Sequence, residues 1–260
     1  MKPFLLLGVR ADDAPSDNEY ASFLAFSGLD EAGLHRVRLE QRPLGPIDLR
    51  DWSGIMLGGG PFNYTDPEDR KSPVQRRVEA DLHQLLHQVV SADFPFLGAC
   101  YGIGALGRRE GAVLDRHHSE PVSCVEITLT AEGRADPLFR VLPGTFRAFT
   151  GHKEAVRVLP PHAVRLAENA ACPVQAFRVG GNVYATQFHA ELDAAGMCTR
   201  VDAYKYAGYF PPEEADEVKA MSRRSDVTHP PALLHQFVGR YARDAAGGRA
   251  AICSPQRAGS

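Results

Sequence analysis

The residue with the strongest potential for chemistry is Cys100, at the end of the apolar run FPFLGACYGIGALG. It is flanked by Gly98 and Gly102 in a G-x-C-x-G pattern. Small residues on both sides of a nucleophile allow a sharp turn from a strand into a helix, which lifts the side chain out of a sheet. At a helix N-terminus the dipole favours the thiolate, the reactive form of cysteine. The pattern predicts a cysteine nucleophile, although a structural cysteine in a glycine-rich turn would give the same five residues.

A candidate base lies in the segment YATQFHAEL, where His189 precedes Glu191 by two residues. On an extended strand these two side chains would share a face, because side chains alternate along a strand. A histidine that accepts a thiol proton needs a carboxylate to fix its tautomer and to stabilise the imidazolium. We therefore predict His189 as the general base and Glu191 as its partner. A histidine at a strand end beside a solvated glutamate is the alternative.

Hydrogen-bond donors for a reaction intermediate are predicted in IMLGGGPFN, where a strand runs into three glycines. The backbone N–H of Gly60, together with that of Tyr101, could form an oxyanion hole. One such donor contributes about 3–4 kcal/mol to stabilising a tetrahedral intermediate. An ordinary tight turn is the other interpretation of the glycine run.

The elements that would position these residues alternate between strand and helix in the first half of the chain. This alternation predicts an α/β fold with a doubly wound, mostly parallel sheet flanked by helices, and with its chemistry at the carboxyl ends of the strands. Strands are expected at residues 4–9, 35–40, 53–61 and 94–100, and helices at residues 16–33 and 67–90, with Ser16 or Asp17 as the first cap.

The second half first changes to short β-like segments, with a hairpin expected to turn at Gly180, Gly181 and Asn182. From about Leu192 the pattern is helical again. We expect one domain at residues 1–192, a helical extension at 193–246 packed on it, and a small, polar and disordered tail at 247–260.

Composition narrows the classes of function. The 260 residues are 44% hydrophobic and 23% charged, with a formal net charge of -3, which gives no reason to expect nucleic acid as a partner. No apolar run is long enough to cross a membrane, and the N-terminus lacks the features of a signal peptide. Five scattered cysteines argue against a disulfide framework or a structural zinc site and suit a reducing cytoplasm. No metal or cofactor is expected.

Taken in order, GGGP, GACYG and QFHAE resemble the class I glutamine amidotransferases, whose members carry G-G-P after a strand, then G-x-C-x-G, then Q-F-H-P-E. CYG in particular resembles the glutaminase domain of GMP synthetases. The resemblance covers about residues 4–191 and implies a flavodoxin-like fold. It also implies hydrolysis of a γ-glutamyl amide through a thioester on the nucleophile. The site residues carried over are Cys100, His189 and Glu191 as the catalytic triad, and Gly60 and Tyr101 as the oxyanion hole.

The resemblance further implies where the substrate binds. FTGHKEAV stands where the backbone of relatives helps to hold the two charged ends of glutamine, and residues 151–154, which include Glu154, could do the same here. A surface loop is the alternative interpretation of this segment. The implied substrate-binding residues are Gly59, Gly104, Gly151, His152 and Lys153.

Two positions depart from the family pattern. Relatives carry Gln where this chain has Gly104, and Pro where it has Ala190. The first departure puts free glutamine in doubt and favours a larger γ-glutamyl compound, because losing a polar contact weakens discrimination. No nucleotide site of a synthetase is apparent, so the leading hypothesis is a stand-alone hydrolase. A glutaminase subunit that needs a separate synthetase partner, and a non-catalytic binding protein, are the alternatives; a homodimer is also compatible with the sequence.

Overall fold

The computed structural model describes residues 1–244 and is built around a nine-stranded sheet with the strand order β2-β1-β3-β4-β11-β10-β9-β6-β7. Neighbouring strands from β2 to β11 in this order are parallel, and only β10 and β6 run against the others. The strands are β1 (Phe4–Gly8), β2 (Leu34–Arg38), β3 (Gly54–Leu57), β4 (Phe96–Ala99), β6 (Glu120–Leu129), β7 (Thr145–His152), β9 (Val164–Glu168), β10 (Ala176–Val179) and β11 (Val183–Thr186). The predicted α/β fold with a mostly parallel sheet is confirmed. A separate pair, β5 (Val113–Asp115) and β8 (Ala155–Val158), was not predicted.

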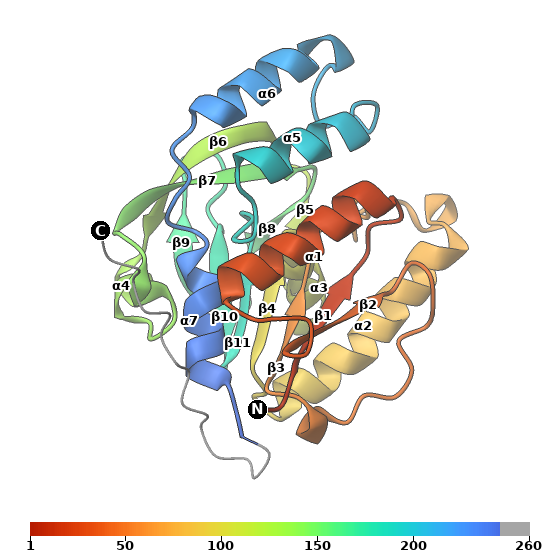
Figure 1. Cartoon of the computed structure of the whole chain (residues 1–260), viewed down its shortest axis with the longest axis vertical. Helices are drawn as coiled ribbons and strands as arrows, with labels where there is room; N and C mark the ends of the chain where they lie inside the picture. The colour runs from red at the N-terminus through yellow and green to blue at the C-terminus, as the bar shows by residue number, and fades with distance from the viewer. Residues whose placement is uncertain (245–260) are drawn as a thin grey trace.

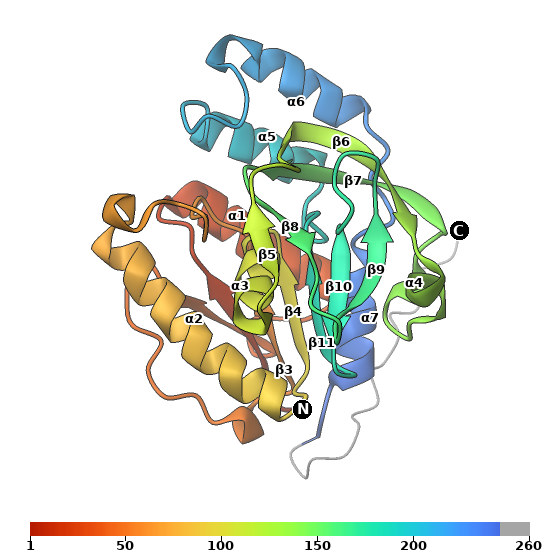
Figure 2. The ribbon, with the colours of Figure 1, turned by 180° about the vertical axis from the view of Figure 1, so that it is seen from behind.

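Helices cover both faces of the sheet. Helices α1 (Asp13–Ser27) and α7 (Ala232–Tyr241) lie on one face, as Figure 1 shows. Helices α2 (Pro73–Ser91) and α3 (Tyr101–Glu110) lie on the other face (Figure 2). A hydrophobic core lies on each face of the sheet, and strand β1 contributes to both, because its alternating side chains point to opposite faces. Phe4 and Leu6 pack with Phe23 and Phe237 on one face. Leu5 and Leu7 pack against α2 on the other face.

Local signals explain where α2 begins. The hydroxyl of Ser72 accepts a hydrogen bond from Gln75 N at 3.0 Å, and Pro73 occupies the first turn, where its missing N–H costs nothing. The predicted start at residue 67 was therefore early; a 3₁₀ turn at Glu68–Arg70 precedes the helix. The first helix was also misplaced, since α1 begins at Asp13 rather than at Ser16 or Asp17.

The hairpin predicted at residues 180–182 is confirmed, since Val179 and Val183 pair across an antiparallel turn. One local expectation was wrong. Strand β11 ends at Thr186, so His189 and Glu191 lie in the loop that follows, not on an extended strand. Any proximity of their side chains therefore comes from the path of this loop rather than from strand alternation.

Within the predicted extension at residues 193–246, α5 (Ala194–Ala203) and α6 (Ala215–Arg224) stack beyond β6 and β7 at the top of Figure 1, whereas α7 packs on the sheet beside α1. Helix α5 is capped by the carboxylate of Asp193, which accepts from Gly196 N at 2.7 Å. Met197, Val201 and Val218 pack with Phe149 of β7 in a small third core.

The tail expected at 247–260 lies outside the described residues. Among residues 1–244, no helix is long and apolar enough to cross a membrane. The remaining elements are α4 (Ala131–Ala135) and 3₁₀ turns at Leu49–Asp51, Phe139–Val141 and Pro212–Glu214.

Candidate active site

Four neighbouring parallel strands bring distant segments to one edge of the sheet. In the order β1, β3, β4 and β11, the carboxyl ends of these strands lead into Arg10, the glycines from Gly58 to Gly60, Cys100 and His189. Ligand sites in open α/β sheets form at such carboxyl ends. Residues that lie far apart in the sequence are thus brought together, as that architecture requires.

Cys100 lies at the turn between β4 and α3, with φ 52° and ψ -92°. Within residues 1–244, Asp93 is the only other non-glycine residue with positive φ. A bulky residue in this region costs about 1–3 kcal/mol, and such strain gathers at functional turns. Gly98 and Gly102 make the turn possible, since a Cβ on Gly98 would lie 2.9 Å from Gly102 Cα. The predicted elbow is therefore present, with the thiol partly exposed at a helix N-terminus.

His189 is held by a buried ion-pair system. Its Nδ1 lies 2.7 Å from Glu191 Oε1, and the same oxygen accepts from Arg200 Nη2 at 2.9 Å. Glu191 is fully buried and His189 is nearly so. Arg200 Nη1 also approaches His189 Nδ1 at 3.0 Å, but both nitrogens are donors once Nδ1 carries a proton. The shorter contact to a carboxylate decides the tautomer: Nδ1–H donates to Glu191, which leaves Nε2 free to take a proton from Cys100.

The charges around His189 favour the imidazolium. Burial lowers the pKa of His189, but the negative charges of Glu191 and Cys100 outweigh burial and raise the pKa to about 9. For Glu191, burial acts in the opposite direction and raises the pKa, but the positive charges of His189 and Arg200 hold that pKa well below its usual range. Glu191 therefore remains ionised whenever His189 accepts a proton. The arrangement suits a histidine that acts first as a base and then as an acid.

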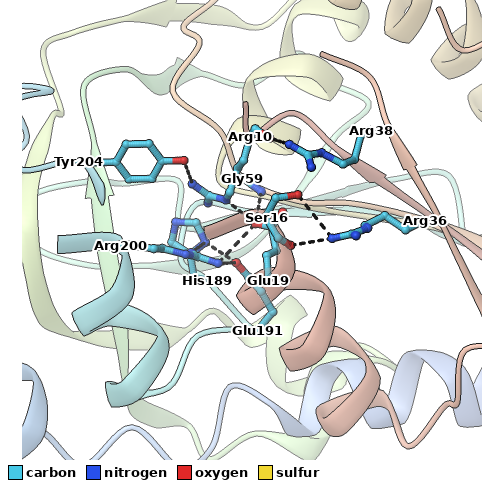
Figure 3. A network of polar contacts seen from close by, with 10 residues as sticks. All are labelled: Arg10, Ser16, Glu19, Arg36, Arg38, Gly59, His189, Glu191, Arg200 and Tyr204. Atoms are coloured by element: carbon cyan, nitrogen blue, oxygen red, sulfur yellow. Dashed lines mark hydrogen bonds and ion pairs between the residues drawn. The ribbon is translucent and has the colours of Figure 1, made fainter. Parts of the chain in front are cut away.

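The ion-pair system extends from His189 and Glu191 to Glu19 of α1, as Figure 3 shows. Glu19 Oε1 accepts from Arg10 Nε at 2.9 Å and from Arg200 Nη2 at 3.3 Å, and all three side chains are buried. Arg10 Nη1 also donates to Tyr204 OH at 3.1 Å. Two arginines and two glutamates thus balance one another beneath the site. Since buried charges are tolerated only when paired, this balance explains how Glu191 remains ionised in the interior.

Gly59 and Gly60 are needed because neighbouring side chains lie too close to them for any Cβ atom, and not because of an ordinary turn. A Cβ on Gly59 would lie 2.6 Å from His189 Cε1, and one on Gly60 would lie 2.1 Å from Val9 Cγ2. Gly59 N–H already donates to Glu19 at 3.2 Å. Among residues 1–244, no acceptor is assigned to Gly60 N–H, and the N–H of Tyr101 opens helix α3, where no helical carbonyl is available. Both groups lie next to Cys100 and are suitable oxyanion donors.

Two of the predicted substrate-binding side chains have other partners. The His152 ring bridges Glu154 O and Glu120 Oε2, each at 2.9 Å. Lys153 Nζ donates to Ala207 O and lies 4.7 Å from the centre of the Tyr209 ring. These contacts fix the loop after β7 and connect it to the extension. Beside Cys100, the end of β7 presents the backbone around Gly151.

Glu120 and His152 also belong to a group whose donor atoms could hold a metal ion, with Cys172 as the third member and all within 4.8 Å. Burial raises the pKa of Cys172 to about 12. Glu120 additionally accepts from Asn169 and Gln175. We interpret the group as a hydrogen-bonded support for the end of β7, which carries Gly151.

The space next to Gly104 is filled by the side chain of Glu154, from another segment of the chain. A Cβ on Gly104 would lie 2.8 Å from Glu154 Oε1, so the carboxylate of Glu154 fills the space next to this glycine. It accepts hydrogen bonds from Tyr64 N at 3.0 Å and Thr65 N at 2.8 Å. Burial raises the pKa of Glu154 despite these bonds. Glu154 lines a cavity that also contains Cys100.

Sequence reasoning missed three charged residues of the site, and for Glu154 it expected only a role of the backbone. Arg10 follows the wholly apolar run at residues 4–9, which is a usable signal for a residue at the edge of the sheet. Glu19 and Arg200 carry no such signal, because their positions depend on how α1 and α5 pack.

Comparison with known proteins gives the family. The family model described as glutamine amidotransferase class-I matches residues 32–197, which is more than half of the chain. This chain belongs to the class I glutamine amidotransferase family. The match includes Cys100, His189 and Glu191 but stops within α5.

Curated relatives are GMP synthases. The chain is 24% identical over 147 residues to the glutamine-hydrolyzing GMP synthase of Petrotoga mobilis, covering 56% of this chain and 26% of that protein. It is 32% identical over 139 residues to that of Thermus thermophilus, covering 53% of this chain and 24% of that protein. For a glutamine-hydrolyzing GMP synthase subunit from Methanothermobacter thermautotrophicus the identity is 27% over 151 residues, covering 58% of this chain and 71% of the other. The chain thus spans about a quarter of the length of the first two relatives.

Solved structures of similar fold include a glutamine amidotransferase from Thermotoga maritima, with a TM-score of 0.70 at 19% identity, covering 93% of this chain and 98% of the other. Another is the glutamine amido transferase from Methylobacillus flagellatus, with a TM-score of 0.68 at 18% identity, covering 94% and 97%. At these identities the likeness establishes the fold of this amidotransferase chain, including helices like those of its extension, and nothing more.

Proposed function

We propose that this chain is an amidohydrolase that cleaves a γ-glutamyl amide, of glutamine or of a larger γ-glutamyl compound, through a thioester on Cys100. The observation that supports this most is the geometry of one corner of the sheet. A cysteine with a positive φ and a histidine line the same cavity, and Nδ1 of the histidine is 2.7 Å from a buried carboxylate. That combination supplies a nucleophile, a base and an orienting group.

In the first half of the reaction, His189 Nε2 takes the thiol proton of Cys100, and the sulfur attacks the γ-carbonyl carbon. The N–H groups of Gly60 and Tyr101 donate to the oxyanion of the tetrahedral intermediate. The intermediate then collapses: the C–N bond breaks and the leaving nitrogen takes the proton from His189. Ammonia or an amine departs, and the glutamyl group remains on sulfur as a thioester.

In the second half, His189 takes a proton from water, and the resulting hydroxide attacks the thioester carbonyl. The C–S bond breaks, the sulfur regains its proton from His189, and glutamate leaves. Glu191 orients His189 throughout and stabilises its charged form. The catalytic residues are thus Cys100 and His189, with Glu191 as a positioning residue.

We propose that Glu154 recognises the α-ammonium group of the glutamyl part. Its carboxylate is buried, makes no ion pair within residues 1–244, and lines a cavity with Cys100. A buried charge without an ionic partner is costly, and a substrate ammonium group would compensate it. Backbone groups of Gly59 and Gly151, next to Gly104 and the loop of His152 and Lys153, complete the proposed substrate site.

The direct test is to incubate the purified protein with glutamine and with γ-glutamyl amides and to measure glutamate release. Activity should be lost in Cys100→Ala, with circular dichroism unchanged. Glutamate release that survives this substitution would overturn the proposal. Binding of the same compounds without any turnover would favour the alternative of a non-catalytic binding protein.

A second candidate is a glutaminase subunit that delivers ammonia to a separate synthetase. The similarity to the GMP synthase subunit of Methanothermobacter thermautotrophicus, 71% of which is covered, is the observation in its favour. It predicts negligible glutaminase activity alone and a rise of at least tenfold when a synthetase from the same source is added. Full activity in isolation, unchanged by that addition, would exclude it. A reducing cytoplasm suits either candidate, since both need a free thiol at residue 100.

A further inference from the structure

A cavity lined mainly by apolar side chains lies beside Cys100, on the side of α5. The centre of a water molecule can move through about 50 Å³ of it, compared with the roughly 10–15 Å³ that one water requires. Val201, Tyr204 and Phe210 lie beyond residue 197, where the family match ends. The walls of this apolar cavity include Val122, Leu192, Met197, Val201, Tyr204 and Phe210.

A second, smaller cavity lies on the other side of Cys100 and is polar. Its lining includes Asn63, Glu154 and Gln187, and within residues 1–244 the buried Oε1 of Gln187 has no hydrogen-bond partner. The apolar and the polar cavity share Gly60, Cys100, Gly151 and Tyr209. A substrate whose carbonyl carbon lies at the sulfur of Cys100 would therefore place one of its ends in each cavity.

The position of His189 decides which end enters which cavity. In the reaction proposed above, His189 must protonate the leaving nitrogen, and a general acid has to lie within hydrogen-bond reach of the atom that it protonates. His189 lines the apolar cavity and is not among the residues of the polar one. The leaving amine consequently faces the apolar cavity, and the zwitterionic end of the glutamyl group faces Glu154.

The charges at the base of the apolar cavity are already compensated. Arg10 and Arg200 both reach it, but they are paired with Glu19 and Glu191. The cavity therefore favours an uncharged substituent over a carboxylate. Thr150 also lines the cavity, and its buried Oγ1 has no hydrogen-bond partner among residues 1–244. It can accept the N–H of a substituted amide.

We propose that the apolar cavity is the binding site for the N-substituent of the substrate, and that the substrates are γ-glutamyl amides of uncharged, apolar primary amines. This inference rests on the proposed function and specifies its substrate class. Ammonia, the leaving group from glutamine, has no apolar part and would gain nothing from these walls. Hydrolysis of such an amide consumes one water and releases glutamate and the free amine.

The test is a series of substrates: glutamine, then the γ-glutamyl methyl-, ethyl-, propyl- and butylamides. Each methylene that the cavity buries should raise kcat/KM about fourfold, the equivalent of about 0.8 kcal/mol. γ-Glutamyl-β-alanine, which carries a carboxylate at similar length, should be a poorer substrate than the propylamide. A wild-type protein that hydrolyses glutamine at least as well as the butylamide, or that prefers the carboxylate compound, would overturn the inference while leaving the proposed function intact.

Two matched variants locate the effect. Val201→Thr keeps the volume of the side chain but places a hydroxyl in the cavity wall, so the ratio of kcat/KM for butylamide over glutamine should fall about tenfold. Val218→Thr makes the same change at a residue of the same small core that does not line the cavity, and should leave that ratio unchanged. An equal ratio in both variants would contradict the assignment. If no amide is hydrolysed, the proposed function fails, and calorimetric binding of butylamide against glutamine to the same protein still decides whether this cavity binds the substituent.

Discussion

Replacing Glu191 with Gln should remove the negative charge that keeps His189 protonated. In the intact site, burial lowers the pKa of His189, yet Glu191 and Cys100 raise it from 6.5 to about 9. That difference corresponds to about 3 kcal/mol in favour of the imidazolium, at roughly 1.4 kcal/mol for each tenfold in the protonation equilibrium. In a Cys100→Ala background the thiolate is absent. Once Glu191 is also replaced, burial and Arg200 act alone, and both lower the pKa below 6.5.

The assay is NMR titration of the ring nitrogens of labelled histidine between about pH 5 and pH 10, which spans the expected range. Cys100→Ala should be compared with Cys100→Ala/Glu191→Gln, and the signal is assigned by its loss in His189→Gln. In an otherwise wild-type chain, Glu191→Gln should lower kcat by about 10⁴-fold, as loss of the equivalent carboxylate does in Ser-His-Asp triads. An unchanged His189 pKa in the double variant, or a loss of kcat below tenfold, would refute this reasoning.

Three further substitutions test other parts of the site. Gly59→Ala should lower kcat/KM about 100-fold with the fold retained, because its Cβ would lie 2.6 Å from His189 Cε1; Gly239→Ala in α7, with open space around it, should leave activity unchanged. Glu154→Gln should raise KM at least tenfold with little change in kcat, as expected when a charged contact to bound substrate is lost, and a change in kcat alone would argue against this role. Burial raises the pKa of Glu120, but its hydrogen bonds lower it below 4.5, so the stability it contributes is present above pH 4.5 and lost as the pH falls through the lower folded value. Glu120→Gln should therefore flatten the acid side of the curve of unfolding free energy against pH, measured by urea denaturation, and an unaltered curve would contradict it.

Much of the first half of the fold follows from the sequence, because its strands are short apolar runs separated by segments of helical period. The strand before Cys100 and the turn at Gly98 and Gly102 follow from residue types alone. The α1 start was placed late, since Asp12 precedes the helix without a side-chain capping bond that would mark it. The pairing of β5 with β8 was missed because three or four residues carry too little pattern.

The candidate site, like the fold, could be predicted only in part. His189 and Glu191 were predicted as partners and do lie within hydrogen-bond distance, yet the reason given was wrong, since a loop and not a strand joins them. Arg200 could not be predicted, because its contact with Glu191 depends on the path of the loop before α5, and its contact with Glu19 depends on the packing of α5 against α1. The carboxylate of Glu154 next to Gly104 likewise depends on two loops meeting. Long-range packing of charged side chains has no signature in one sequence.

The most direct measurement is the reaction of the protein with an electrophilic glutamine analogue, followed by peptide mass spectrometry. The account predicts one adduct per chain, on Cys100, formed faster than at Cys124, Cys172 or Cys198, prevented by excess substrate and slowed strongly in His189→Ala. Labelling spread evenly over the cysteines, or labelling of Cys100 at the same rate without His189, would contradict it.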